Sequence, residues 1–98
     1  MTTINFERSG GVAGNEIHLK LDLNSLPADE AQNLLKLISE ADFFKIPENL
    51  VAKSTTDEFR YTITVNAGQS SHTVHTSDTT MPKPLLPLVN ELTMLKTP

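Results

Sequence analysis

Glu16-Ile-His-Leu-Lys-Leu-Asp-Leu23 decides the fold of this chain, because apolar and polar residues alternate along it without interruption. Successive side chains of a β-strand point to opposite faces of the sheet, so strict alternation indicates a strand with one buried side and one solvent-facing side. The buried side carries the apolar residues Ile17, Leu19, Leu21 and Leu23. The remaining elements follow on either side of this predicted strand.

Another strand is predicted just before this segment, over Thr3–Arg8, where Ile4 and Phe6 alternate with polar residues. Ser9–Asn15 lies between the two strands, and it is rich in glycine and too long for a tight hairpin turn. We therefore expect an antiparallel hairpin whose strands are joined by a long glycine-rich loop.

The hydrophobic period changes after Pro27, where apolar residues recur with the three- and four-residue spacing of a helix. These residues are Ala31, Leu34, Leu35 and Ile38. Pro27 suits the first turn of a helix because its φ angle is already close to the helical value. The pattern predicts a helix that begins near Pro27 and ends near Asp42, followed by Phe43 and Phe44 as a plug at one end of the core.

The second half of the chain repeats the hairpin pattern. Phe59–Val65 alternates like a strand, Asn66–Gln69 has the composition of a turn, and Ser70–Thr76 is predicted as the returning strand. The preceding stretch, Glu48–Asp57, is polar and is predicted to be mostly loop. A final helix is predicted after about Leu85, because prolines at positions 82, 84 and 87 restrict helical structure before that point.

These elements predict a single domain, residues 1–98, of the α+β class in the order ββαββα. We expect a four-stranded antiparallel sheet with both helices on one face. The core would contain Phe43, Phe44, Tyr61 and the leucines of both helices. The directions of the strands bring three irregular segments to one end of the sheet, namely Ser9–Asn15, Glu48–Asp57 and Ser77–Pro82. Loops that meet on a rigid scaffold commonly form binding sites, so we expect the functional surface at that end.

The composition excludes several classes of function. The chain has 98 residues, with 8 Lys and Arg against 12 Asp and Glu, so its net charge is −4 and nothing suggests binding to nucleic acid. Because it contains no cysteine, disulfides and thiolate metal sites are excluded. No apolar stretch has the length of a membrane span or of a signal peptide. We expect a cytoplasmic protein, with export by a route that needs no signal peptide left open.

The titratable residues do not form an enzymatic site. His72 and His75 are three apart in a predicted strand, so they point to opposite faces and cannot chelate one ion, while His18 lies in the other hairpin. The glycine-rich stretch Gly10–Gly14 precedes a strand, whereas phosphate-binding loops use the N-terminus of a helix. We therefore expect no catalytic residues, no cofactor and no metal site, and a protein-binding or inhibitory role becomes the better hypothesis.

The sequence resembles the emfourin family. The resemblance rests on five segments in the same order along nearly the whole chain: Phe6-Glu-Arg-Ser-Gly-Gly-Val-Ala-Gly14, Leu26-Pro-Ala-Asp-Glu-Ala31, Ala41-Asp-Phe-Phe-Lys-Ile-Pro47, Asp57-Glu-Phe-Arg-Tyr-Thr-Ile-Thr-Val65 and His72-Thr-Val74. Emfourin-like proteins are small bacterial inhibitors of protealysin-like metallopeptidases, which are relatives of thermolysin. The resemblance implies a protein inhibitor of such an enzyme.

The resemblance also implies a mechanism with two loops. An aspartate from one loop coordinates the catalytic zinc of the target, and a neighbouring apolar loop occupies a substrate-binding subsite. The apolar loop matches Gly10, Gly11, Val12, Ala13 and Gly14, and Val12 would be the side chain that enters the subsite. Other family members often have a larger residue, commonly Phe, at the place of Val12.

Two residues are candidates for the zinc-coordinating aspartate, Asp78 and Asp57. Asp78 is favoured because the Ser and Thr residues around it have few packing obligations. A turn or cap aspartate before the last helix is the structural alternative for Asp78, and a cap at the start of the third strand is the alternative for Asp57.

Two other functions remain open at the level of the sequence. A non-inhibitory interaction module could use the same loop cluster to bind another protein. A weak enzyme or small-molecule binder would need an enclosed apolar pocket with converging polar groups, which the sequence does not indicate. In each case we expect a monomer that neither binds nucleic acid nor inserts into a membrane.

Overall fold

The computed structural model describes residues 2–10, 16–50 and 59–96. It has the α+β order ββαββα, in agreement with the prediction. The strands and helices are β1 Thr2–Gly10, β2 Ile17–Asp22, α1 Ala28–Glu40, β3 Phe59–Ala67, β4 Ser70–Ser77 and α2 Leu86–Lys96. Short 3₁₀ helices at Leu23–Ser25, Phe43–Lys45 and Lys83–Leu85 join or precede them.

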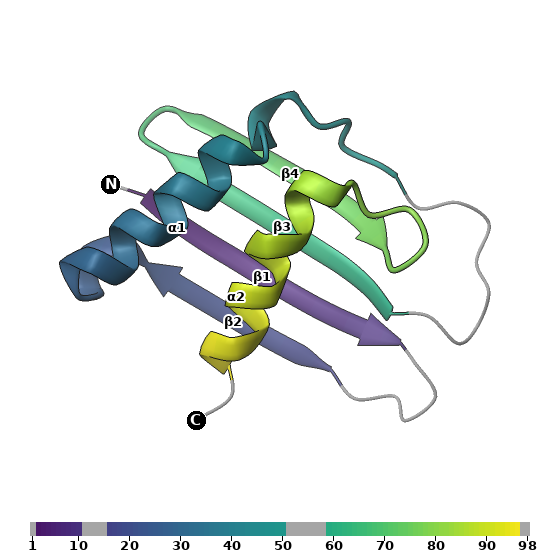
Figure 1. Ribbon diagram of the computed structural model, residues 1–98, viewed down its shortest axis with the longest axis horizontal. Helices are drawn as coiled ribbons and strands as arrows, with labels where there is room; N and C mark the ends of the chain where they lie inside the picture. The colour runs from purple at the N-terminus through teal and green to yellow at the C-terminus, as the bar shows by residue number, and fades with distance from the viewer. Residues whose placement is uncertain (1, 11–15, 51–58, 97–98) are drawn as a thin grey trace.

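The four strands form one antiparallel sheet in the order β2-β1-β3-β4 (Figure 1). The two hairpins therefore meet through their first strands, and β2 and β4 lie at the edges. β1 pairs with β3 along its whole length, from Thr2 opposite Ala67 to Gly10 opposite Phe59. This long central pairing makes β1 and β3 the rigid part of the scaffold.

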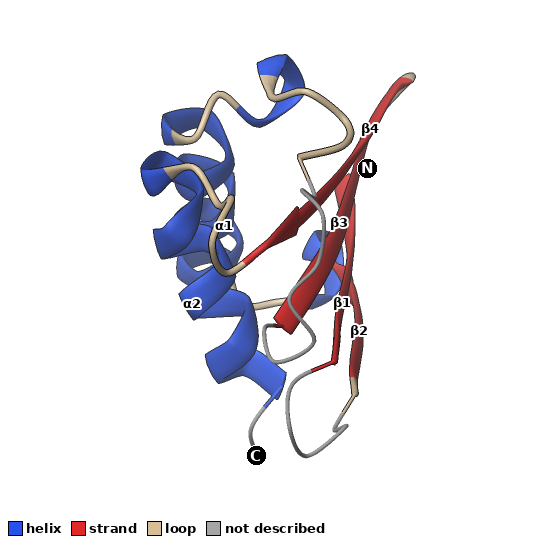
Figure 2. Cartoon of the chain, turned by 90° about the vertical axis from the view of Figure 1, so that its right-hand side faces the viewer, coloured by secondary structure: helices blue, strands red, loops and turns tan. Residues whose placement is uncertain are grey.

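The helices and the sheet form two layers. Figure 2 shows α1 and α2 on the same side of the sheet, which leaves the other face without a covering element among the described residues. The fully buried side chains of the strands belong to the covered face, and they include Ile4, Phe6, Ile63 and Val74. They pack with helix residues such as Leu34, Leu88 and Leu92 into one hydrophobic core. Burial of this apolar surface is the main force that holds the two layers together.

β1, β3 and β4 are longer than their local patterns predict. β1 extends beyond the predicted limit of Arg8 because Ser9 and Gly10 pair with Arg60 and Phe59. Gly10 itself has φ 91°, a conformation that glycine adopts without the steric cost of a Cβ. The extra length comes from pairing with distant strands, which a local sequence pattern does not contain.

The path after α1 differs from the prediction. We expected the segment that begins at Glu48 to lie at the loop-bearing end of the sheet. The chain after α1 instead contacts the beginning of β4, where His72 Nε2–H donates to the Ile46 carbonyl at 2.6 Å. Residues 48–50 then run along the edge of β4, and Leu50 N–H donates to the His75 carbonyl at 2.7 Å. Asn49 therefore forms an isolated parallel bridge with His75 of this edge strand, whereas Glu48 and Leu50 on either side of it have no regular secondary structure.

Three residues that we assigned to the core are partly exposed. Leu35 and Leu86 are each 46% exposed, and Phe44 is 40% exposed, whereas its neighbour Phe43 is buried. The apolar stripe of α1 is wider than the surface it contacts, so Leu34 lies in the core and Leu35 at its margin. α1 ends at Glu40, before the predicted limit of Asp42, because Asp42 has the left-handed φ of 51° that stops a helix.

Candidate functional site

The strand register brings the predicted loop-bearing ends together. Gly10 at the end of β1 lies opposite Phe59 at the start of β3, and Arg60 lies opposite Ser77 at the end of β4. Ile17 at the start of β2 lies opposite Arg8. Figure 1 shows these four strand ends on the same, right-hand side of the sheet. We call this side the loop end, and the opposite side, at the tight turn between β3 and β4, the turn end.

Asp78 is held at the loop end by hydrogen bonds to β3. Its Oδ2 accepts from Phe59 N–H at 3.0 Å, and its Oδ1 accepts from the Tyr61 hydroxyl at 2.8 Å. The Asp78 N–H in turn donates to the Phe59 carbonyl at 3.2 Å. The residue is exposed to solvent on its remaining side. Asp78 therefore fastens the turn after β4 to the first residues of β3.

Tyr61 is the buried partner in this arrangement. Burial, with a second contribution from the hydrogen bond to Asp78, raises the pKa of Tyr61 from 10.0 to about 12. The phenol consequently stays protonated and continues to donate to Asp78 throughout the neutral and mildly alkaline range. Both groups belong to the same polar cluster at the margin of the core.

Arg8 completes the cluster and was missed in the sequence analysis. Its guanidinium carbon lies 4.3 Å from the centre of the Phe59 ring, in a cation–π contact. Its Nε is buried and has no hydrogen-bond partner. The sequence held one signal for it, since Arg8 continues the alternation of Ile4 and Phe6 and so places a positive charge on the apolar face of β1.

The other predicted site residues are described only in part. Gly10 ends β1 at the loop end, as stated above, whereas Gly11, Val12, Ala13 and Gly14 lie outside the described residues. Asp57 also lies outside them. Of the two candidate aspartates, Asp78 is thus the one whose contacts the structure describes.

The three histidines lie apart, as the strand positions predict. His72 is on the helix-covered side, where its ring stacks on Phe44 at 6.0 Å, while His75 Nδ1 forms a hydrogen bond with Thr62 Oγ1 at 3.1 Å on the open face. His18 is also on the open face. Within the part of the chain that the structure describes, no group of three His, Asp or Glu side chains is placed to hold a metal ion.

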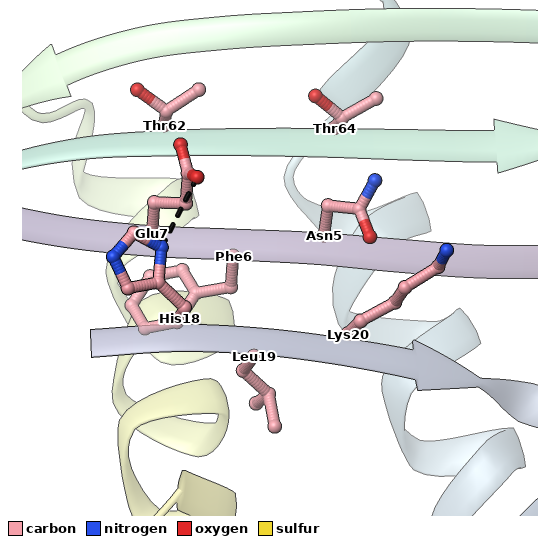
Figure 3. Close-up of a pocket in the computed structure, with 8 residues that line it drawn as sticks. All are labelled: Asn5, Phe6, Glu7, His18, Leu19, Lys20, Thr62 and Thr64. Carbon is pink, nitrogen blue, oxygen red and sulfur yellow. Dashed lines mark hydrogen bonds and ion pairs between the residues drawn. The ribbon is translucent and has the colours of Figure 1, made fainter.

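The open face of the sheet has a depression of about 300 Å³, lined mainly by polar side chains (Figure 3). At its rim, His18 Nδ1 lies 3.2 Å from a Glu7 oxygen, and His18 Nε2 lies 3.2 Å from a Glu16 oxygen. The two carboxylates, Glu16 first and Glu7 second, raise the pKa of His18 above its ordinary value of 6.5. They bond to opposite sides of the ring, so they support a protonated histidine and do not converge on one ion.

Comparison with known proteins identifies the family. The family model named Emfourin matches residues 6–93, which is most of the chain. The chain belongs to the emfourin family. This match confirms the resemblance seen in the sequence, and the family is one of inhibitors and not of enzymes. No curated protein and no solved structure shows a significant match. Among the described residues, none of the helices combines the length and hydrophobicity needed to cross a lipid bilayer.

Proposed function

We propose that this protein inhibits a zinc metallopeptidase of the thermolysin or protealysin type by placing its loop end in the enzyme's active site. The observation that carries the proposal is membership in the emfourin family over residues 6–93. The geometry supports it, because the ends of the strands that flank the predicted inhibitory loops are brought to one side of a rigid sheet. A rigid base lowers the entropic cost of ordering loops on binding.

The zinc of such an enzyme offers a clear way to block catalysis. A catalytic zinc has three protein ligands and one open position that holds the nucleophilic water. A carboxylate oxygen at about 2.0–2.2 Å from the metal would take that position, and the displaced water could no longer attack a peptide bond. The inhibitor would then occupy the active site without being cleaved.

The contacts of Asp78 bear on which aspartate would bind the zinc. Both of its oxygens accept a hydrogen bond within the chain, and each oxygen retains a second acceptor site. Coordination by Asp78 would therefore have to use a solvent-facing lone pair while Tyr61 and Phe59 hold the carboxylate in place. Asp57 remains the alternative ligand, and Asp78 would then act by holding the start of β3, two residues after Asp57.

The glycine-rich segment supplies the second part of the proposal. Val12, flanked by Gly10, Gly11, Ala13 and Gly14, is the apolar side chain proposed to enter the subsite beside the scissile bond. Glycine and alanine neighbours have little bulk, so they permit close approach to a narrow cleft. Valine fills less of a large subsite than the Phe common in the family, so the contribution of this contact to affinity would be correspondingly smaller.

The proposal is tested by measuring the residual activity of purified thermolysin and protealysin as the protein is added. We expect activity to fall in proportion to the inhibitor and to reach its minimum at a ratio of about one to one, as for a tight complex. Asp57→Asn and Asp78→Asn each remove one candidate charge while preserving shape. The variant of the zinc-binding residue should lose inhibition by at least about a hundredfold, the cost of a strong charged contact.

Two further variants make the result specific. Val12→Gly should weaken inhibition by about tenfold, the effect of losing one small apolar side chain from a subsite. Asp29→Asn is the matched control, because Asp29 lies in the first turn of α1, away from the loop end, and should inhibit as the wild type does. Absence of inhibition of either enzyme at micromolar concentrations of the wild-type protein would refute the proposal.

A further inference from the structure

A small pocket lies at the loop end, between the ends of β1 and β4 and the first turns of α2. It has a volume of about 210 Å³, and its charged lining residues are Arg8, Asp78 and Lys83. Ligand-binding pockets for whole small molecules are usually about 300–1,000 Å³, so this pocket is too small for a typical cofactor. Its size is that of a single side chain.

Among the described residues, the two cations that line the pocket outnumber its one carboxylate. Within residues 2–10, 16–50 and 59–96, the ion pairs are those of His18, so neither Arg8 nor Lys83 has a carboxylate partner there. Arg8 also has a buried Nε without an acceptor. A partly buried guanidinium whose Nε has no acceptor has lost hydration without gaining a full set of hydrogen bonds. Its contacts with the Phe59 ring and the Tyr61 hydroxyl compensate only part of that loss.

Asp78 offsets only part of this positive charge and forms no ion pair with either cation among the described residues. Its two oxygens are directed to the Phe59 N–H and the Tyr61 hydroxyl. The pocket therefore carries two cations and one carboxylate that is already hydrogen-bonded, in a chain whose net charge is −4. Met81, Leu86 and Val89 add apolar walls, which reduce the local dielectric constant and strengthen any ion pair formed inside.

We propose that this pocket binds the carboxylate of an aspartate or glutamate side chain presented by the protein partner. The planar guanidinium of Arg8 matches a carboxylate in geometry as well as in charge, and Lys83 at the exposed rim would supply a second cation. The identity of the partner rests on the proposed function, since the pocket lies at the loop end. The ligand chemistry does not, because it follows from the charges that line the pocket.

The first test uses a carboxylate probe and no protease. The probe is the α-amide of N-acetylglutamic acid, whose side-chain carboxylate is its only charge, and its control is the α-amide of N-acetylglutamine. Because Arg8 Nε is shielded from solvent, its N–H should give a visible signal in a ¹⁵N–¹H correlation spectrum. We expect the acidic probe to shift this signal saturably, with a Kd of roughly 10 mM, typical of one charged contact by a small fragment.

The variants for this test remove one positive charge each. Arg8→Gln should abolish saturable shifts at the signals of Tyr61 and Asn90, which also line the pocket, and Lys83→Gln should weaken binding about threefold. Lys83 is exposed, so that variant is expected to fold even if Arg8→Gln does not. Lys45→Gln removes the same charge outside this pocket and should leave binding unchanged. Equal shifts with both probes, or no saturable shift, would overturn the proposal.

The second test asks whether the partner uses the pocket. With thermolysin as the probe, Arg8→Gln should raise the inhibition constant by about tenfold and make it less sensitive to salt, while Lys45→Gln should not change it. Inhibition by Arg8→Gln equal to that of the wild type would exclude a partner carboxylate in the pocket. If the wild-type protein binds the acidic probe but does not inhibit any such peptidase, the pocket is supported and the inhibitory function is refuted.

Discussion

The two ends of the sheet differ in how their polar side chains are paired, although the same strands form both. At the turn end, polar groups find partners within the chain. His72 packs against Phe43 with ring centres 5.6 Å apart, and its Nε2–H is used by the Ile46 carbonyl. At the loop end, Arg8 has no carboxylate partner among the described residues, and an exposed aspartate lies beside it in the same pocket. At the turn end, the hydrogen-bonding capacity of His72 is thus used within the chain. At the loop end, Arg8 keeps a charge and an N–H group that could bind a partner.

This difference predicts that changes at the turn end affect stability, whereas changes at the loop end affect binding more than stability. Natural proteins often separate the two roles in this way, because a binding site leaves groups unsatisfied that a stable core would pair.

Removal of the Phe43 ring should produce the largest loss of stability. Phe43 is 1% exposed, so Phe43→Ala leaves a cavity in the core and should lower the free energy of unfolding by about 3–5 kcal/mol. Phe44→Ala is the matched control, with an expected loss of about 1 kcal/mol because that ring is 40% exposed. Urea denaturation followed by circular dichroism gives both values. Similar losses for the two variants would contradict the structure, in which Phe43 is buried in the core at the turn end and Phe44 is partly exposed.

Removal of the Tyr61 hydroxyl should have a moderate effect at the loop end. Tyr61→Phe takes one hydrogen-bond donor from Asp78 and should lower the free energy of unfolding by about 1–2 kcal/mol at neutral pH. The variant should also leave the Asp78 side chain held by Phe59 N–H alone, so the inhibition constant should change more than it does for a turn-end variant. An unchanged inhibition constant would show that the hydrogen bond from Tyr61 to Asp78 does not contribute to binding of the enzyme.

The ionisation of Tyr61 sets the pH above which its contribution to the stability of the loop end is lost. Its pKa is raised from 10.0 to about 12 in the folded protein, so its protonated form is favoured by folding. The associated stability is complete below pH 10 and is lost as the pH rises toward 12. Tyr61 is the one tyrosine and the chain has no tryptophan, so phenolate absorbance reports on it directly. An ordinary pKa near 10 in the folded protein would contradict its burial.

The tight turn at the turn end offers a smaller test. Gly68 has φ 64°, and a Cβ added there would meet no atom within 4 Å, so any cost of Gly68→Ala comes from backbone conformation alone. We expect a loss of about 1 kcal/mol in the free energy of unfolding. Gly68→Asn should be better tolerated, because asparagine adopts this conformation more readily. Neither variant should change the inhibition constant, and a change would break the division between the two ends.

The smallest expected effect concerns His18 on the open face. Its pKa, measured from the ring proton shifts by NMR, should lie above 6.5, and Glu16→Gln should lower it more than Glu7→Gln does, since Glu16 makes the larger contribution. The raised pKa means that the stabilising contacts are complete below pH 6.5 and are lost as the pH rises through the folded-state value. A pKa at or below 6.5 would show that these contacts do not persist in solution.

Much of the fold could be predicted from the sequence, because β2 and α1 carry strong local periodicity. The edge bridge at Asn49 could not, since it depends on a pairing with His75 that leaves no local signal. The exposure of Leu35 was also beyond prediction, because the width of the surface that α1 contacts is set by the sheet and by α2.

The candidate site was less predictable than the fold. The sequence indicates that several connections meet at one end, but not that Arg8 stacks on Phe59 or that Asp78 accepts hydrogen bonds from β3. Such contacts join residues that are far apart in the chain, and they follow only from the strand register. The local sign that the sequence held for Arg8 was a positive charge in the otherwise apolar alternation of Ile4 and Phe6.

The most direct test of the account is hydrogen–deuterium exchange of the protein with and without a stoichiometric amount of thermolysin. If the loop end enters the active site, protection should be gained at the turn Asp78–Pro82 and at Lys83, and the turn end around Gly68 should exchange as in the free protein. Protection that appears at the turn end or on the open face instead would contradict the assignment of the loop end as the inhibitory surface.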